Sequence, residues 1–197
     1  MEGRAYATLV DTAEVASHLG DGSFRLLEVD EDTTAFAGGH IRGASGVDWK
    51  DDLQDRVRRD FIGPQAFAAL MARFGIGNES EVVLYGGNNN WFAAYAYWYF
   101  KYYGHDRVRL MDGGRKKWQL EGREMTSEET RSTTTTGYLT AGLRDEIRAL
   151  RGYVELAVLA TPGFGLVAVL SPAEARGDEG RTAGGGPAQI LSRIHPS

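Results

Sequence analysis

At 197 residues and a net charge of −5, the chain is long enough for one domain of usual size with an appendage, and it lacks the positive field that nucleic acid requires. Hydrophobic residues are 42% and charged residues 25%, and no apolar run approaches the roughly 18 residues of a membrane span. The absence of cysteine excludes disulfides, thiolate metal sites and any mechanism with a cysteine nucleophile. Residues 1–6 carry no apolar signal-peptide core, so the expected location is cytoplasmic.

Strands and helices are predicted to alternate through the first 124 residues. Hydrophobic runs predict five strands, at residues 7–10, 24–29, 46–49, 82–85 and 107–111. Capping residues, apolar spacing and terminal glycines predict the intervening helices, at residues 12–19, within 35–44, and at 64–74, 91–103 and 115–121. Residues 50–59 are expected to form a charged surface excursion. This alternation indicates a parallel α/β sheet with right-handed crossovers.

Residues 82–104 are predicted to place a short loop between a buried strand and an aromatic helix. Nine of the thirteen residues from 91 to 103 are aromatic and only Lys101 is charged, so protein should cover most of this helix. The Asn90 side chain is expected to cap its first turn. Gly104 is expected to end it in the left-handed conformation.

The loop is the candidate functional site, because α/β proteins bind anions where a strand ends and the N–H groups of a helix begin. Its residues are Gly86, Gly87, Asn88, Asn89, Asn90 and Trp91. None of them is nucleophilic, so no catalysis by the loop is expected. The alternative is an ordinary connection whose glycines and asparagines permit a tight turn.

Other polar clusters have a structural interpretation beside a functional one. The acidic residues 28–32 end a strand, where a site could lie, but a solvated loop is favoured. Residues 115–117 are interpreted as a solvated helix face, and the glycine pair at 113–114 as a structural turn rather than a phosphate site. The histidines show no metal-ligand spacing, and neither a metal nor a cofactor is expected; they are His18, His40, His105 and His195.

Composition shifts after residue 124. Residues 125–136 have almost nothing to bury, and 125–140 are predicted to be a linker. Beyond them, a charged helix at 143–150 and one strand at 165–170 are expected, whereas residues 177–187 are rich in glycine and charge and should be disordered. Residues 141–197 cannot close a sheet of their own, and we expect an incomplete C-terminal appendage.

A series of motifs resembles the rhodanese (thiosulfate sulfurtransferase) family, specifically the first half of its tandem two-domain members. In order along residues 5–123 the motifs are Leu27-Glu28-Val29-Asp30, Gly39-His40-Ile41-Arg42-Gly43-Ala44, Asp48-Trp49, Val82-Val83-Leu84-Tyr85-Gly86, Asn89-Asn90-Trp91, Tyr103-Gly104-His105 and Asp112-Gly113-Gly114-Arg115-Lys116-Lys117-Trp118. The resemblance implies a rhodanese-like parallel sheet flanked by helices on both faces. It also implies sulfur transfer from thiosulfate to cyanide or another thiophile, through a cysteine persulfide held in a cradle of N–H groups.

The chain departs from the family pattern at its centre. By the resemblance, Gly86 stands at the position of the catalytic cysteine, so we expect the cradle to survive without its nucleophile. First domains of tandem members are usually empty in this way. Residues 168–172 resemble the start of a second domain without its acidic and basic members, and the pattern dissolves after Gly177. Arg42 replaces the usual proline of its motif.

Three interpretations stay open: a sulfurtransferase by family membership, a non-catalytic binding module, and a truncated or frame-shifted copy. We expect a rhodanese-like domain at residues 1–124, a linker at 125–140, and at 141–197 the remnant of a second such domain, partly disordered at its end. The favoured hypothesis is that this chain transfers no sulfur by itself. Its expected partners are thiosulfate or another small anion, bound weakly, and a second copy through an uncovered interdomain face. No nucleic-acid or membrane partner is expected.

Overall fold

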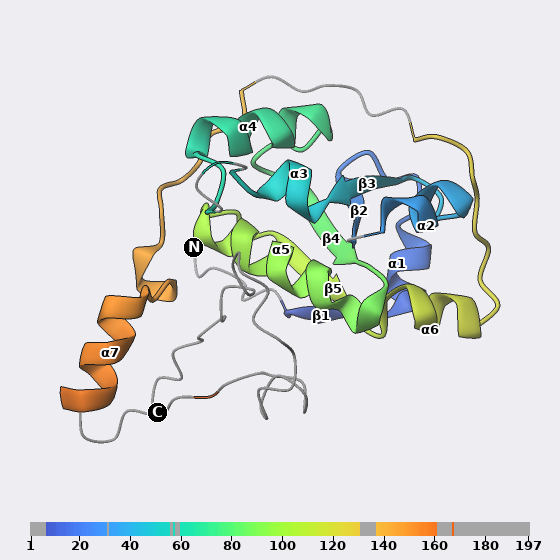
Figure 1. The fold of residues 1–197 in the computed structure, drawn as a ribbon. Helices are drawn as coiled ribbons and strands as arrows, with labels where there is room; N and C mark the ends of the chain where they lie inside the picture. Colours follow the sequence, from blue (N-terminus) through green and yellow to red (C-terminus); the bar gives the residue numbers. More distant parts are fainter. Residues whose placement is uncertain are drawn as a thin grey trace. The chain divides into compact units, whose positions relative to one another are not determined.

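The computed structural model describes residues 7–30, 32–55, 57, 60–130, 137–160 and 167. The chain divides into two compact units, Met1–Leu143 and Arg144–Ser197. All strands of the described residues lie in the first unit, together with the candidate loop (Figure 1). Among those residues, no helix combines the length and the hydrophobicity that crossing a membrane would require.

The first unit is built on one parallel sheet, and its strands confirm the five predicted ones. They are β1 Leu9–Val10, β2 Phe24–Asp30, β3 Ala44–Asp48, β4 Glu81–Tyr85 and β5 Val108–Met111. Their order is β1-β5-β4-β2-β3, with every neighbouring pair parallel. β4 is central, and Glu28 of β2 lies opposite Tyr85 of β4. The carboxyl ends of β2 and β4 therefore meet beside the loop.

The described residues of the first unit contain six α-helices. They are α1 Thr12–Ser17, α2 Thr33–Gly38, α3 Trp49–Leu53, α4 Pro64–Arg73, α5 Trp91–Tyr102 and α6 Gly114–Leu120. Helices α1 to α5 lie between successive strands and α6 follows β5. α3 corrects the predicted surface excursion at residues 50–59. Asp48 accepts hydrogen bonds from the N–H groups of Lys50 and Asp51, and Leu53 is buried, so this charged stretch begins as a capped helix.

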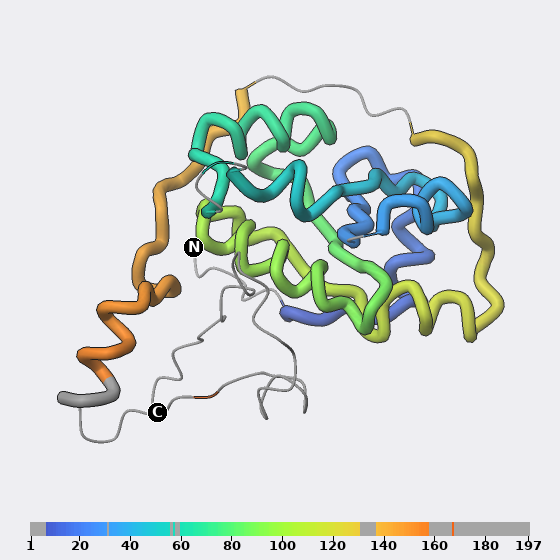
Figure 2. The backbone as a smooth tube through the Cα atoms, viewed as in Figure 1, coloured from blue at the N-terminus to red at the C-terminus, as the bar shows by residue number. Residues whose placement is uncertain are grey.

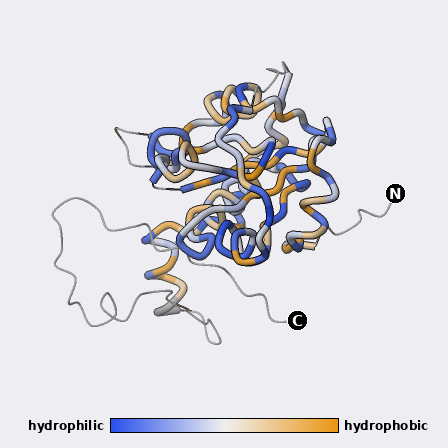
Figure 3. The backbone as a smooth tube through the Cα atoms, turned by 90° about the vertical axis from the view of Figure 1, so that its right-hand side faces the viewer, coloured by the Kyte–Doolittle hydropathy of each residue, from blue (hydrophilic) through white to orange (hydrophobic). Residues whose placement is uncertain are grey.

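Helices cover both faces of the sheet, as the resemblance implies. On one face, Val15 of α1 and Trp118 of α6 join one hydrophobic cluster with Leu26, Val83 and Tyr85 of the strands. Side chains alternate along a strand, so the residues between these point to the opposite face. There α5 contacts β2, β4 and β5. Residues 82–85 of β4, between these two layers, are fully buried, and orange, hydrophobic stretches run through the middle of the fold in Figure 3.

The aromatic helix α5 is mostly covered, which confirms the prediction from its composition. Phe61 packs against rings of α5, and Phe67 of α4 stacks on Tyr103 with ring centroids 4.3 Å apart. The Tyr99 hydroxyl accepts the N–H of Ile62 at 2.9 Å, and burial raises the pKa of Tyr99. Trp91, at the start of α5, is the exception, with 50% of its surface exposed.

The predicted linker at residues 125–140 packs in part against the first unit. Thr126 pairs with His40 as an antiparallel bridge, and His40 Nε2 lies 3.1 Å from the carbonyl oxygen of Glu128. Tyr138 is buried. Backbone pairing at Thr126 and the buried ring of Tyr138 therefore attach both described parts of this stretch to the first unit. Residues 131–136 lie outside the described residues.

The second unit differs from prediction where it is described. The expected helix at 143–150 is reduced to one 3₁₀ turn, η2 Asp145–Ile147, and the helix of this unit is α7 Arg151–Ala160. An Arg151–Glu155 ion pair of 2.6 Å, one helical turn apart, supports α7. The predicted strand at 165–170 and the later remnant of a second domain lie outside the described residues, apart from residue 167.

Candidate functional site

The loop follows β4 and folds as a left-handed turn before α5. Its three asparagines form η1 Asn88–Asn90, with φ values of 50°, 55° and 63°. L residues other than glycine rarely adopt this conformation, although asparagine tolerates it better than most. The turn therefore needs compensating bonds elsewhere in the loop.

Asn90 supplies these bonds, in a role that differs from the predicted one. Its side chain makes no cap bond to α5. Instead, Asn90 Oδ1 accepts the N–H of Gly86 at 3.0 Å, and Asn90 Nδ2 donates to the Met111 carbonyl at 2.7 Å. The left-handed backbone turns the side chain back toward the start of the loop. Asn90 thus ties the carboxyl end of β4 to that of β5.

Gly86 is enclosed by backbone on more than one side. A Cβ atom placed on Gly86 would overlap the carbonyl oxygen of Val29. The Gly86 carbonyl accepts the N–H of Arg115 at 3.0 Å, which fixes it from the start of α6. The expectation that the loop keeps a cradle shaped for a side chain at Gly86 is therefore wrong. Any larger residue would require the backbone of β2 or β4 to shift.

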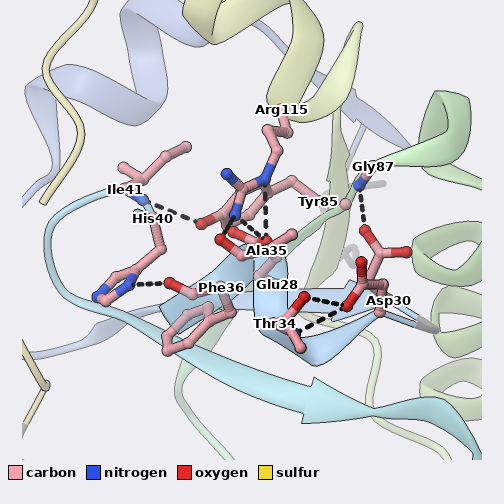
Figure 4. A network of polar contacts seen from close by, with 12 residues as sticks. Glu28, Asp30, Thr34, Ala35, Phe36, His40, Ile41, Tyr85, Gly87 and Arg115 are labelled. Atoms are coloured by element: carbon pink, nitrogen blue, oxygen red, sulfur yellow. Dashed lines mark hydrogen bonds and ion pairs between the residues drawn. The ribbon is translucent and has the colours of Figure 1, made fainter. Parts of the chain in front are cut away.

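An internal carboxylate faces the loop. Gly87 donates its N–H to Asp30 Oδ2 at 2.7 Å, and Asp30 is the last residue of β2 (Figure 4). The Gly87 carbonyl in turn accepts the N–H of Asn90 at 2.9 Å. N–H groups of Gly86, Gly87 and Asn90 are thus bonded within the protein. A negative side chain stands where an external anion would approach Gly87.

A buried ion pair lies behind the loop. Arg115 Nε donates to Glu28 Oε1 at 3.0 Å, with a second bond from Arg115 Nη2, which also donates to the Ala35 carbonyl at 3.1 Å (Figure 4). The Glu28 side chain is 1% exposed and that of Arg115 is 12% exposed. The interpretations of residues 28–32 as a solvated loop and of 115–117 as a solvated face are therefore wrong for these two residues.

Tyr85 completes this network. Its hydroxyl accepts the N–H of Ile41 at 3.1 Å, at the end of the turn after α2 (Figure 4). Burial, with the neighbouring negative charge of Glu28, raises the pKa of Tyr85, so the ring stays neutral. The buried polar groups join β2, β4, α2 and α6. They hold the scaffold together.

The remaining sequence candidates also have structural roles where they are described. Gly113 and Gly114 adopt φ values of 76° and 54°, and a Cβ on Gly114 would overlap Asn90 Oδ1, so this pair is a close-contact turn. Within the described residues no group of three or more His, Asp or Glu side chains is placed to hold a metal. His195 lies outside those residues. The bond from Gly87 to Asp30 was missed, because residues 57 positions apart give no local signal.

The sequence was compared with protein families and with curated proteins. The profile of the Rhodanese-like domain family matches residues 11–121. A protein of Saccharopolyspora erythraea that carries the name of a thiosulfate sulfurtransferase is 53% identical over 169 residues, which are 86% of this chain and 59% of that protein. The sulfur carrier protein TtuD of Thermus thermophilus is 51% identical over 173 residues, 86% of this chain and 60% of that protein. The chain thus spans about three fifths of the length of these relatives.

Solved structures share the fold at low sequence identity. SseA from Escherichia coli, a 3-mercaptopyruvate sulfotransferase described with the rhodanese fold, matches with a TM-score of 0.69 at 21% identity, over 79% of this chain and 63% of that one. The anaerobic ergothioneine biosynthesis enzyme from Chlorobium limicola gives a TM-score of 0.67 at 21% identity, over 80% and 43% of the two chains. The family profile covers more than half of the chain, and the sheet has the fold of these structures. The chain belongs to the rhodanese-like domain family.

Proposed function

We propose that this chain acts as a non-catalytic rhodanese-like domain and does not transfer sulfur through a persulfide. The observation that carries the proposal is Gly86. By family resemblance it occupies the place of the nucleophile, it has no side chain, and the Val29 carbonyl fills the space that a side chain would need. The chain also has no cysteine anywhere in its 197 residues. The absence of a thiol and the lack of space at Gly86 are therefore two independent obstacles to sulfur transfer.

The competing function is thiosulfate:cyanide sulfurtransferase activity, which the names of relatives favour. Those relatives are longer than the matched region, so their names do not by themselves assign the activity to this region. A non-catalytic domain contributes by supporting another domain or by binding a partner. Self-association and a cytoplasmic location stay predictions from the sequence. Light scattering of the purified chain over a range of concentrations would detect the first.

For the anion, we propose that Asp30 acts as a built-in competitor. Thiosulfate and sulfate are drawn to the N–H groups and positive dipole at the start of α5. The Asp30 carboxylate already accepts the Gly87 N–H and repels a second negative charge. Weak anion binding, the expectation from the sequence, is therefore limited by this one side chain.

The catalytic part of the proposal is tested by following thiocyanate formation from thiosulfate and cyanide. We expect the purified chain to match a no-protein control, and its intact mass to gain no sulfur atom after incubation with thiosulfate, because no thiolate is available. A turnover rate above the control would contradict the proposal.

The closed space at Gly86 is tested with Gly86→Ala and Gly86→Cys. Each should lower the free energy of unfolding by about 1–3 kcal/mol, the usual cost of overpacking, because Cβ meets the Val29 carbonyl. Urea denaturation measures the change. Gly22→Ala is the matched control, since a Cβ on Gly22 meets nothing within 4 Å. Unchanged stability, with a persulfide on Gly86→Cys after thiosulfate treatment, would show that the cradle is open.

The role of Asp30 is tested with Asp30→Asn, which removes the charge and keeps the size. We expect sulfate and thiosulfate to bind about tenfold more tightly, equivalent to about 1.4 kcal/mol, as one like-charge contact is relieved. The amide resonances of Gly87 and Trp91 would report binding in an NMR titration. Asp21→Asn, at the opposite end of β2, changes the net charge equally and should leave affinity unchanged. Equal affinities for both variants would refute the competitor role.

A further inference from the structure

A short segment that begins at residue 137 is attached to the first unit at few points. We call residues 137–142 the strap. Tyr138 is 7% exposed and packs edge-on against Phe67, with ring centroids 5.9 Å apart. Leu139 exchanges two hydrogen bonds with the Asn78 side chain, at 3.0 Å and 2.6 Å. Figure 2 shows the strap running beside the helix that Figure 1 labels α4, in agreement with the contact between Tyr138 and Phe67.

The two ends of the strap and its low burial are features of a segment that can move. Gly137 and Gly142 stand at its two ends with φ values of 91° and 118°, and a Cβ on either would meet nothing within 4 Å. Leu139 is 72% exposed, so Tyr138 is the main buried anchor. Besides Tyr138, only the Leu139–Asn78 hydrogen bonds and the close approach of Ala141 to Gly104 are seen to attach the described strap, so with two permissive glycines it can leave without disturbing the sheet.

The hydroxyl of Tyr138 contacts a buried histidine, His105. His105 is 3% exposed; its Nε2 lies 3.1 Å from the Ser80 carbonyl, and its Nδ1 lies 3.2 Å from the Tyr138 hydroxyl. A carbonyl only accepts, so Nε2 carries the hydrogen and Nδ1 of the neutral ring accepts from Tyr138. Burial lowers the pKa of His105 to about 4, although the Ser80 carbonyl and the nearby Asp106 favour the charged form. The docked strap therefore favours a neutral imidazole.

The charges around His105 do little to offset this preference. Asp106 is paired with Lys101 at 3.3 Å, and Lys101 itself disfavours a second positive charge. Glu79, near Ser80, is paired with Arg107 at 3.2 Å. The strap contributes only uncharged residues, Gly-Tyr-Leu-Thr-Ala-Gly. It covers the ring and brings no counter-charge to it.

We propose that the strap is an acid-released latch, in which Tyr138 docks on neutral His105 and holds the start of the connection to the second unit against the first. Protonation of His105 favours the undocked strap, because water then reaches the imidazolium. Release frees six residues, which lengthens the connection by up to about 20 Å.

The direction of the pH effect follows from linkage. The docked state has a His105 pKa of about 4 and the solvated ring a value near 6.5, so docking is fully favoured above pH 6.5 and weakens as the pH falls toward 4. At most, the docking equilibrium falls by roughly 300-fold over that interval, tenfold per pH unit.

The experiment is an NMR pH titration of the full chain between pH 7.5 and 4.5. The Leu139 amide reports docking and the Val83 amide, in β4, reports the sheet. We expect the Leu139 resonance to move to its random-coil position while Val83 stays dispersed. A strap that stays docked until Val83 also collapses would overturn the proposal.

Two variants separate the latch from general acid sensitivity. His105→Gln keeps a donor and an acceptor but cannot be protonated, so its strap should stay docked at pH 4.5. His18→Gln, at a half-buried histidine that follows α1, should behave as the native chain does. If His105→Gln does not fold, Tyr138→Phe decides. It keeps the ring and removes the hydroxyl that bonds Tyr138 to His105, so docking is weaker at every pH and release should occur at higher pH. An unchanged midpoint would refute the latch.

Discussion

The buried charge of Glu28 is the constraint on which the arrangement of the site depends. A carboxylate this deeply buried costs several kcal/mol unless a cation and further hydrogen bonds accompany it. Arg115 is that cation, and its position at the start of α6 fixes where this helix begins. Breaking the pair would leave a lone buried charge, which is far more costly than the small net gain that an intact buried pair contributes.

The closed loop follows from that position. Once Arg115 reaches Glu28, its own N–H lies 3.0 Å from the Gly86 carbonyl. Gly114, one residue earlier, then lies so close to Asn90 that no side chain fits between them. Asn90 spans the gap to Met111 and compensates the left-handed turn, whose residues each cost of order 1 kcal/mol in strain. The absence of a side chain at Gly86 is thus required by the scaffold, because neighbouring backbone occupies the place that a side chain would take.

The sequence predicts local features well and distant pairings poorly. The run Val82 to Tyr85 predicts β4, and the following glycines and asparagines predict a tight turn, because both depend on neighbouring residues. The family resemblance adds the sheet and its helices. Neither predicts that Glu28 pairs with Arg115 across 87 residues, or that Asp30 faces Gly87, since opposite charges are common on any surface. The strap was missed for a similar reason: one tyrosine in a polar stretch gives no periodic signal.

The loop and the strap belong to different ends of the same strand. The loop follows Tyr85 at the carboxyl end of β4, whereas Asn78 and Ser80, which contact Leu139 and His105, precede β4 at its amino end. The interior between them is fully buried, and its packing resists gradual deformation. Protonation at His105 therefore acts on the strap locally and leaves the bonds of Asn90 intact. The bonds that hold the loop involve backbone groups, Asn90 and Asp30, and none involves a reactive side chain. A domain arranged this way can therefore lack a nucleophile and still keep the loop in a fixed conformation.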